Sequence, residues 1–138
     1  MGTIVVAVTV VIHTVGLMGL TALMARLIRF FSLHNHGPGE TVAMVATVLG
    51  IFVLHTAEVW IWAPAYYKVD ATANFKDALY FSTTTFSTLG YGDIVLSRTW
   101  RQFGAIEGVN GFILIGWSTA YLVAASMRYG PFRSGEHF

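Results

Sequence analysis

The chain has 138 residues, of which 55% are hydrophobic and only 11% are charged, and its mean hydropathy is +0.63. This composition is typical of an integral membrane protein and excludes an ordinary water-soluble domain. The formal net charge is +1 and the eight Lys and Arg residues are scattered, which argues against a nucleic-acid partner. Because cysteine is absent, a disulfide framework and a thiolate metal site are excluded as well.

The first predicted element is an apolar helix over residues 4–24, interrupted only by His13 and a few Thr and Gly residues. Its length of about 21 residues matches the ~20 that cross a bilayer as a helix. Arg26 and Arg29 follow it and close the span. A polar stretch, SLHNHGPGE, comes next, and its Gly and Pro residues predict a short loop.

The second predicted span covers residues 41–63 and ends in the run WIWAPAYY. Pro64 is expected to stop this helix, because proline cannot donate the next backbone hydrogen bond. Aromatic residues at this end are expected to form a belt at the membrane interface: Trp60, Trp62, Tyr66 and Tyr67. The third predicted span covers residues 102–127.

A shorter helix is predicted between the last two spans, over residues 75–87. At ~1.5 Å per residue, its last 11 or so residues cover about 16 Å, half of a membrane. Asn74 with Asp77 three residues later resembles a capping box, which places the helix start near Phe75. A segment that ends at this depth must be buried in protein or line a wet cavity, because unpaired peptide groups are costly in lipid. We therefore predict an all-α membrane protein with three transmembrane helices and a re-entrant loop.

The segment STLGYGD, residues 87–93, follows this short helix and carries Gly90 and Gly92 two positions apart. A backbone that directs successive carbonyl oxygens at one axis alternates between right- and left-handed dihedral angles, and glycine adopts the left-handed ones at low cost. Rings of such oxygens, made by several chains, replace the hydration shell of an ion. The expected ligands are the carbonyls of Thr88, Leu89, Gly90 and Tyr91, with the Thr88 hydroxyl.

The side chains around this segment are expected to support it. Tyr91 should point away from the axis and be braced by an aromatic ring, the candidates being Tyr80, Phe81 and Trp100. Asp93 should lie at the outer mouth. The hydroxyl groups of residues 82–87 should satisfy buried polar groups behind the loop.

The run ALYFSTTTFSTLGYGDI resembles the pore helix and selectivity filter of tetrameric potassium channels. The resemblance covers roughly residues 41–127, and the signature matches at positions 88 and 90–93. Leu89 departs from the commoner Val or Ile. Thr84 stands where some members place a glutamate, so a carboxyl partner for Asp93 is missing there.

The resemblance implies a homotetramer in the lipid bilayer of the cell membrane that conducts K⁺ passively. It implies no catalysis, no cofactor, and no metal other than K⁺ at the filter. It also places the N-terminus outside the cell and the C-terminus in the cytoplasm, although the Lys and Arg counts on the two sides are tied. The chain then divides into an additional N-terminal transmembrane helix, a cytoplasmic loop, a pore module and a cytoplasmic tail too short for a ligand-binding domain: 1–31, 32–40, 41–128 and 129–138.

The same match assigns roles on the third span. Gly111 takes the position of the family's hinge glycine, with Gly108 as a nearby alternative. The residues implied to line the cavity and the gate are Phe112, Ile115, Gly116 and Thr119. Packing of small residues against a neighbouring helix is the alternative explanation for these glycines.

Glu107 lies one helical turn from Asn110 on the third span, and a carboxylate within a membrane is costly without a partner. We expect Glu107 to accept hydrogen bonds from hydroxyls of the short helix, Thr84 or Thr85. Such bonds would stiffen the filter from behind. A role in ion attraction or gating is the alternative.

Three further polar residues lie within the first two spans: His13, and the pair His55 and Glu58. If the two helices are antiparallel, each histidine lies about nine residues from the same membrane face, and therefore at the same depth. The favoured interpretation is a hydrogen-bonded cluster that joins the extra helix to the pore module. Proton sensing and ligation of haem or a metal are the alternatives. His34, His36 and His137 are predicted to be cytoplasmic.

Two other functions stay open at this point. One is a nonselective monovalent cation channel, against which Tyr91 argues. The other, from a different class, is a small haem-binding membrane cytochrome with His13 and His55 as axial ligands. The cytochrome fits three short spans but leaves STLGYGD unexplained.

Overall fold

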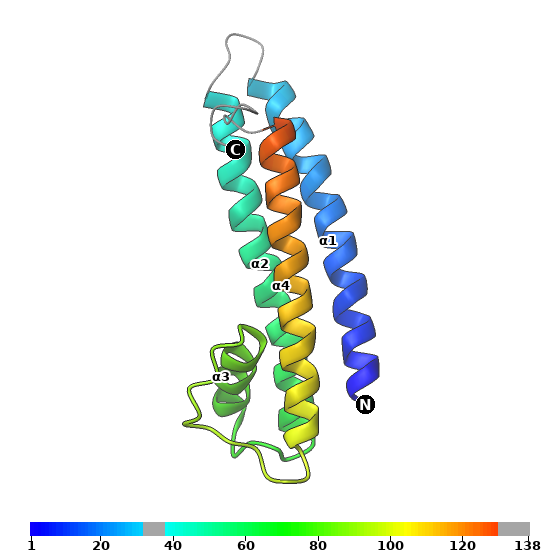
Figure 1. The fold of residues 1–138 in the computed structure, drawn as a ribbon, viewed down its shortest axis with the longest axis vertical. Coiled ribbons are helices and arrows are strands. Elements are labelled where there is room, and N and C mark those ends of the chain that lie inside the picture. The colour runs from blue at the N-terminus through cyan, green and yellow to red at the C-terminus, as the bar shows by residue number, and fades with distance from the viewer. Residues whose placement is uncertain (32–37, 130–138) are drawn as a thin grey trace.

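The computed structural model describes residues 1–31 and 38–129; the three histidines predicted to be cytoplasmic lie outside this part of the chain. Its helices are α1 (Gly2–Phe31), α2 (Pro38–Lys68), α3 (Phe75–Phe86) and α4 (Arg101–Tyr129). Figure 1 shows α1, α2 and α4 side by side as a long bundle, with the short α3 beside one end. The N-terminus lies at that same end (Figure 1).

The three long helices are each long and apolar enough to cross a membrane. The apolar stretches are Gly2–Phe30, Gly39–Lys68 and Arg101–Arg128, with mean hydropathies of 2.2, 1.9 and 1.4. The 12 residues of α3 span only about 18 Å, too little to cross a bilayer. The predicted all-α membrane fold with three transmembrane helices is therefore confirmed.

Pro64 lies inside α2, so the prediction that it ends the helix at residue 63 is wrong. A proline inside a helix removes one hydrogen bond and costs about 3 kcal/mol. Packing offsets this cost, because the residues on both sides of Pro64 are buried in the core: Trp62, Ala63, Ala65 and Tyr66. The helix consequently continues to Lys68.

The predicted aromatic belt is wrong for two of its four residues. Trp60 and Tyr67 are 52% and 50% exposed, so their place at a membrane interface stays a prediction. Trp62 and Tyr66 are fully buried and form the core at the end of the bundle where α3 packs. The ring of Tyr66 lies 5.0 Å from that of Phe103 on α4, and the Trp62 ring lies 5.2 Å from it.

The additional helix α1 packs closely on α2 through two glycines. A Cβ atom on Gly16 would lie 2.5 Å from Leu54, and one on Gly50 would lie 2.2 Å from Leu20. Without a strong hydrophobic driving force between helices in lipid, such close approach through small residues stabilises their association. The extra helix is thus an integral part of the bundle of this chain.

The short helix α3 runs from one end of the bundle to about its middle. Asn74 caps its start, since the Asn74 side chain accepts a hydrogen bond of 2.9 Å from the Asp77 N–H. Phe75 contacts Trp60 near the end of α2, with ring centroids 5.9 Å apart. At the other end, the Phe86 ring lies 5.7 Å from that of His55, about 20 Å along α2 from Lys68. α3 therefore enters the depth of the bundle without crossing it.

Candidate functional site

The segment after α3 alternates in backbone handedness. Thr88, Gly90 and Gly92 have φ angles of +60°, +49° and +80°, at every second position. The sequence predicted the left-handed angles of the two glycines. It gave no signal for Thr88, because a threonine is expected to avoid positive φ.

Hydrogen bonds fix the direction of the carbonyl groups in this segment. The backbone N–H groups of Leu89 and Gly90 both donate to the Thr84 carbonyl oxygen, at 2.9 and 3.0 Å. In a trans peptide the C=O group points opposite to the following N–H group, and cis peptides are absent among residues 1–31 and 38–129. The carbonyls of Thr88 and Leu89 therefore point away from the Thr84 carbonyl at the end of α3.

Residues 87–93 are all exposed in the single chain. Leu89 is 55% and Tyr91 is 68% exposed, although both side chains are largely apolar. Two of the rings proposed to brace Tyr91 are engaged elsewhere, since Phe81 packs on Tyr66 and Trp100 packs on Phe103. The bracing of Tyr91 by one of the three proposed rings stays a prediction.

The end of this segment is held to α3 by a hydrogen bond between Tyr80 and Asp93. The Tyr80 hydroxyl donates to the Asp93 carboxylate at 2.7 Å. This bond lowers the pKa of Asp93 and raises the pKa of Tyr80. Asp93 therefore keeps its negative charge at neutral and mildly acidic pH. The partner that the sequence left open for Asp93 is a phenol, while the Thr84 hydroxyl donates to the Phe81 carbonyl, 3.1 Å away.

Glu107 joins three helices behind this segment. Its carboxyl group accepts hydrogen bonds from the Ser82 hydroxyl of α3, at 2.5 Å, and from the Tyr66 hydroxyl of α2. All three side chains are fully buried. The expected partners Thr84 and Thr85 were wrong, because Ser82 is the hydroxyl of α3 that faces α4. Tyr66 was missed because it had been assigned to the membrane interface.

We expect Glu107→Ala to destabilise the protein by about 1–3 kcal/mol, because a buried hydroxyl left without a partner carries its desolvation penalty. Most of the effect should come from Tyr66, since Ser82 keeps an acceptor in the Val59 carbonyl, 3.1 Å away. Glu107→Gln should lower the stability of the protein less than Glu107→Ala does, because the amide oxygen still accepts a hydrogen bond. Thermal unfolding in detergent, followed by circular dichroism, measures both variants.

A double-mutant cycle with Tyr66→Phe provides the control. Glu107→Ala should destabilise the Tyr66→Phe variant less than it destabilises the wild type, because the Tyr66 hydroxyl that would lose its partner is already absent. Equal unfolding temperatures for Glu107→Ala and the wild type would contradict the bracing role.

The glycines of α4 occupy different environments. A Cβ atom on Gly111 would lie 2.1 Å from the Phe86 carbonyl oxygen, so this glycine allows α4 to contact the end of α3. On Gly108 the nearest atom would be the Thr85 carbonyl oxygen at 3.8 Å. Gly116 has open space around it. The structure thus supports the packing explanation for Gly111, while a hinge role there stays a prediction.

The other residues assigned to the cavity by resemblance differ in exposure. Phe112 is 70% exposed, and Thr119 is exposed with its hydroxyl donating to the Ile115 carbonyl at 2.9 Å. Ile115 is half-buried and packs against the aromatic core. Phe112 and Thr119 are therefore exposed in the single chain, Ile115 packs partly within it, and a role of the three residues in a cavity stays a prediction.

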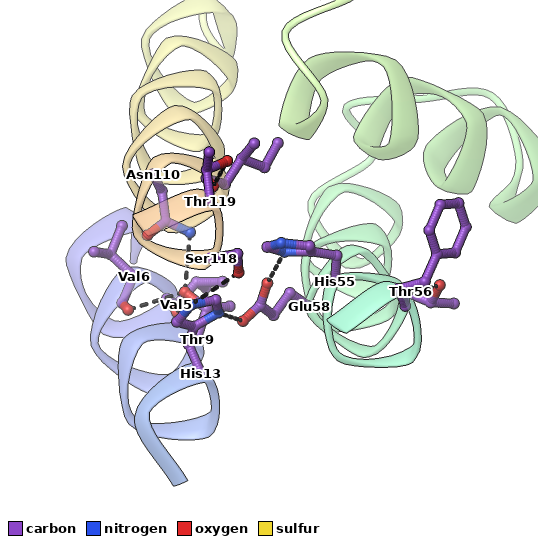
Figure 2. A network of polar contacts seen from close by, with 12 residues as sticks. Val5, Val6, Thr9, His13, His55, Thr56, Glu58, Asn110, Ser118 and Thr119 are labelled. Atoms are coloured by element: carbon purple, nitrogen blue, oxygen red, sulfur yellow. Dashed lines mark hydrogen bonds and ion pairs between the residues drawn. The ribbon is translucent and has the colours of Figure 1, made fainter. Parts of the chain in front are cut away.

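The histidines of the first two spans meet in the bundle, as their equal depth predicted. Nδ1 of His13 and Nδ1 of His55 each lie 2.8 Å from a different oxygen of the Glu58 carboxylate. Figure 2 shows this cluster between α1 and α2, with Ser118 of α4 beside it. On the same face, the Asn110 amide donates to the Thr9 hydroxyl at 3.0 Å. Polar contacts therefore join α1 to both long helices of the pore module.

Three membrane-spanning helices, a half-length helix and a segment of alternating handedness define a membrane channel built around a pore loop. A family model described as "Ion channel" matches residues 54–128, more than half of the chain. The chain belongs to this ion-channel family, which confirms the resemblance noted in the sequence. Neither a search of curated proteins nor a search of solved structures gave a match.

Proposed function

We propose that this channel conducts K⁺ selectively and passively through a four-fold pore lined by residues 88–92. The observation that carries the proposal is the alternation of positive φ at Thr88, Gly90 and Gly92. The Thr84 carbonyl oxygen also accepts hydrogen bonds from the N–H groups of Leu89 and Gly90. The alternation and these hydrogen bonds together support an arrangement in which carbonyl oxygens are aligned on one side of the segment. Carbonyl oxygens in rings are the ligands that replace the hydration shell of K⁺.

The proposed pore is a homotetramer. One chain supplies one loop, and a ring of oxygens around an ion needs several. Closed rotational symmetry brings identical loops together about one axis, and the full exposure of residues 87–93 is consistent with a surface that other copies cover. In this assembly Asp93 would lie at the mouth, where its charge attracts cations.

The proposed setting is the cell membrane, with the pore loop and the N-terminus facing outside. α3 and the N-terminus share one end of the bundle, so they face the same side whichever orientation is correct (Figure 1). Conduction through carbonyl rings requires no covalent chemistry. The proposal therefore includes no enzymatic step and no cofactor.

The cytochrome alternative does not fit the geometry of the histidine cluster. Axial ligation requires two imidazole nitrogens to face one iron from opposite sides of a flat macrocycle. Here Nδ1 of His13 and Nδ1 of His55 face the Glu58 carboxylate instead, and the ring centroids are 5.5 Å apart. Trp117 also packs on His13, with ring centroids 5.4 Å apart. We therefore do not propose haem binding.

Ion flux into liposomes tests the proposed selectivity. Purified protein is reconstituted, and uptake is compared under a K⁺ gradient, a Na⁺ gradient and no gradient. We expect rapid flux with K⁺ and a much slower flux with Na⁺. Equal flux of the two ions would indicate a nonselective cation channel, and uptake equal to that of empty vesicles would contradict conduction altogether.

A further inference from the structure

Three titratable side chains lie in the middle of the bundle and take no part in the proposed conduction. The side chains of His13 and Glu58 are fully buried, and that of His55 is 19% exposed. Their ligand atoms, one from each residue, all lie within 4.8 Å of one another. We propose that His13, His55 and Glu58 form an intramembrane binding site for a divalent transition-metal ion of the Zn²⁺ type.

The ligand set suits such an ion. Two imidazole nitrogens and a carboxylate form a three-ligand zinc site that leaves one position open. Bonds of about 2.0–2.2 Å to N and O ligands place neighbouring ligand atoms roughly 3.4 Å apart around a tetrahedral ion. The two Nδ1–carboxylate distances of 2.8 Å are shorter than this spacing, and the three ligand atoms all lie within 4.8 Å of one another. Small shifts of the three side chains would therefore admit the ion.

Outer contacts hold the two imidazoles in place. Metal-bound histidines commonly bond through their other ring nitrogen to a fixed polar group. Nε2 of His13 lies 3.4 Å from the Ser118 hydroxyl, and the Trp117 ring packs on the same imidazole. The ring of His55 packs against Phe86 at the end of α3. Figure 2 shows the two imidazoles converging on Glu58 from different helices.

The charge of the cluster also favours an ion. A carboxylate between two neutral imidazoles has a net charge of −1, which is costly at this depth of a membrane. A Zn²⁺ ion with a hydroxide in the open position makes the total charge zero, and zinc-bound water ionises near pH 7. One additional proton on an imidazole would neutralise the cluster equally, so a cluster that holds protons only is the alternative to be tested.

His55 is the member of the site that borders an open groove. This groove has a volume of about 430 Å³, lies between α2 and α3, and is also lined by Phe86 and Ile115. His13 belongs to α1, and Ser118 belongs to α4. An ion held here would tie the additional helix to the pore module and would stabilise the folded chain by mass action.

Metal binding is measured on the full-length protein, purified without a histidine tag and stripped with a chelator. We expect Co²⁺ to bind at one ion per chain with visible absorption bands, Zn²⁺ to displace it, and Zn²⁺ to raise the unfolding temperature. Single variants His13→Gln, His55→Gln and Glu58→Gln should each weaken binding more than about tenfold, since even outer partners change metal affinity by ~10–100-fold. The matched control is the triple variant His34→Gln, His36→Gln, His137→Gln, which should bind as the wild type does.

X-ray absorption spectroscopy of the zinc-loaded wild type gives a readout that does not depend on folding of the variants. Two imidazoles at about 2.0 Å would support the site. Zinc without imidazole ligands, binding lost in the triple control, or a wild type that holds no metal would each overturn the proposal, and the last result would leave a proton-only cluster. None of these readouts requires conduction, so failure of the proposed K⁺ selectivity would leave the result interpretable.

Discussion

The substitution Gly90→Ala is expected to abolish K⁺ flux while the chain still folds. Gly90 has a φ of +49°, which an alanine adopts at a cost of about 1–2 kcal/mol. In a proposed ring of four copies the cost becomes about 4–8 kcal/mol, whereas ~1.4 kcal/mol already changes a population tenfold. The loop should therefore leave the conducting conformation, and flux into liposomes should fall at least tenfold.

The added methyl group itself meets no obstacle, because a Cβ atom on Gly90 has no other atom within 4 Å in the single chain. Circular dichroism should thus show unchanged helix content. Gly19→Ala is the matched control, since Gly19 also has open space around it but lies within α1 at an ordinary helical φ. Flux by Gly90→Ala equal to that of Gly19→Ala would mean that the alternating backbone is not required for conduction.

Features that depend on local sequence could be predicted well. The Asn74 cap fixes the start of α3, and two glycines at the spacing of an alternating backbone fix the angles at positions 90 and 92. The meeting of His13 with His55 was also predictable. It follows from the constant rise of two antiparallel helices, which converts a residue count into depth.

Features that depend on helix rotation could not be predicted. Ser82 and Thr84 are both hydroxyl residues of α3, but they point about 160° apart around the helix axis. Only the packing of α3 on its neighbours decides which of them reaches Glu107. The positive φ of Thr88 has a similar origin, since it accompanies the turn that brings two N–H groups onto the Thr84 carbonyl.

Packing also overrides the two sequence signals at the end of α2. Pro64 predicts a helix end, and the aromatic residues around it predict an interface. Trp62 and Tyr66 instead pack on Phe103 of α4, and their burial holds the helix together through the proline. A single sequence does not show that α4 supplies this partner.

The substitution Gly111→Ala is expected to destabilise the protein by about 3 kcal/mol, near the upper end of the usual cost of overpacking. A Cβ atom at position 111 would lie 2.1 Å from the carbonyl oxygen and 2.8 Å from the Cα atom of Phe86. These are backbone atoms, so no side-chain rotation can make room. α3 and α4 must move apart, and the close contact between the end of α3 and α4 is lost.

Gly108→Ala is the matched control, because position 108 lies on α4 beside the same end of α3. Its Cβ atom would make an ordinary contact of 3.8 Å with the Thr85 carbonyl oxygen. Alanine is favoured over glycine in a helix by about 0.8–1.0 kcal/mol, so Gly108→Ala should unfold at the same or a higher temperature than the wild type. If Gly111 acts only as a hinge, Gly111→Ala should change K⁺ flux without lowering the unfolding temperature. A lowered unfolding temperature in Gly111→Ala alone would show that close contact between α3 and α4 requires glycine there.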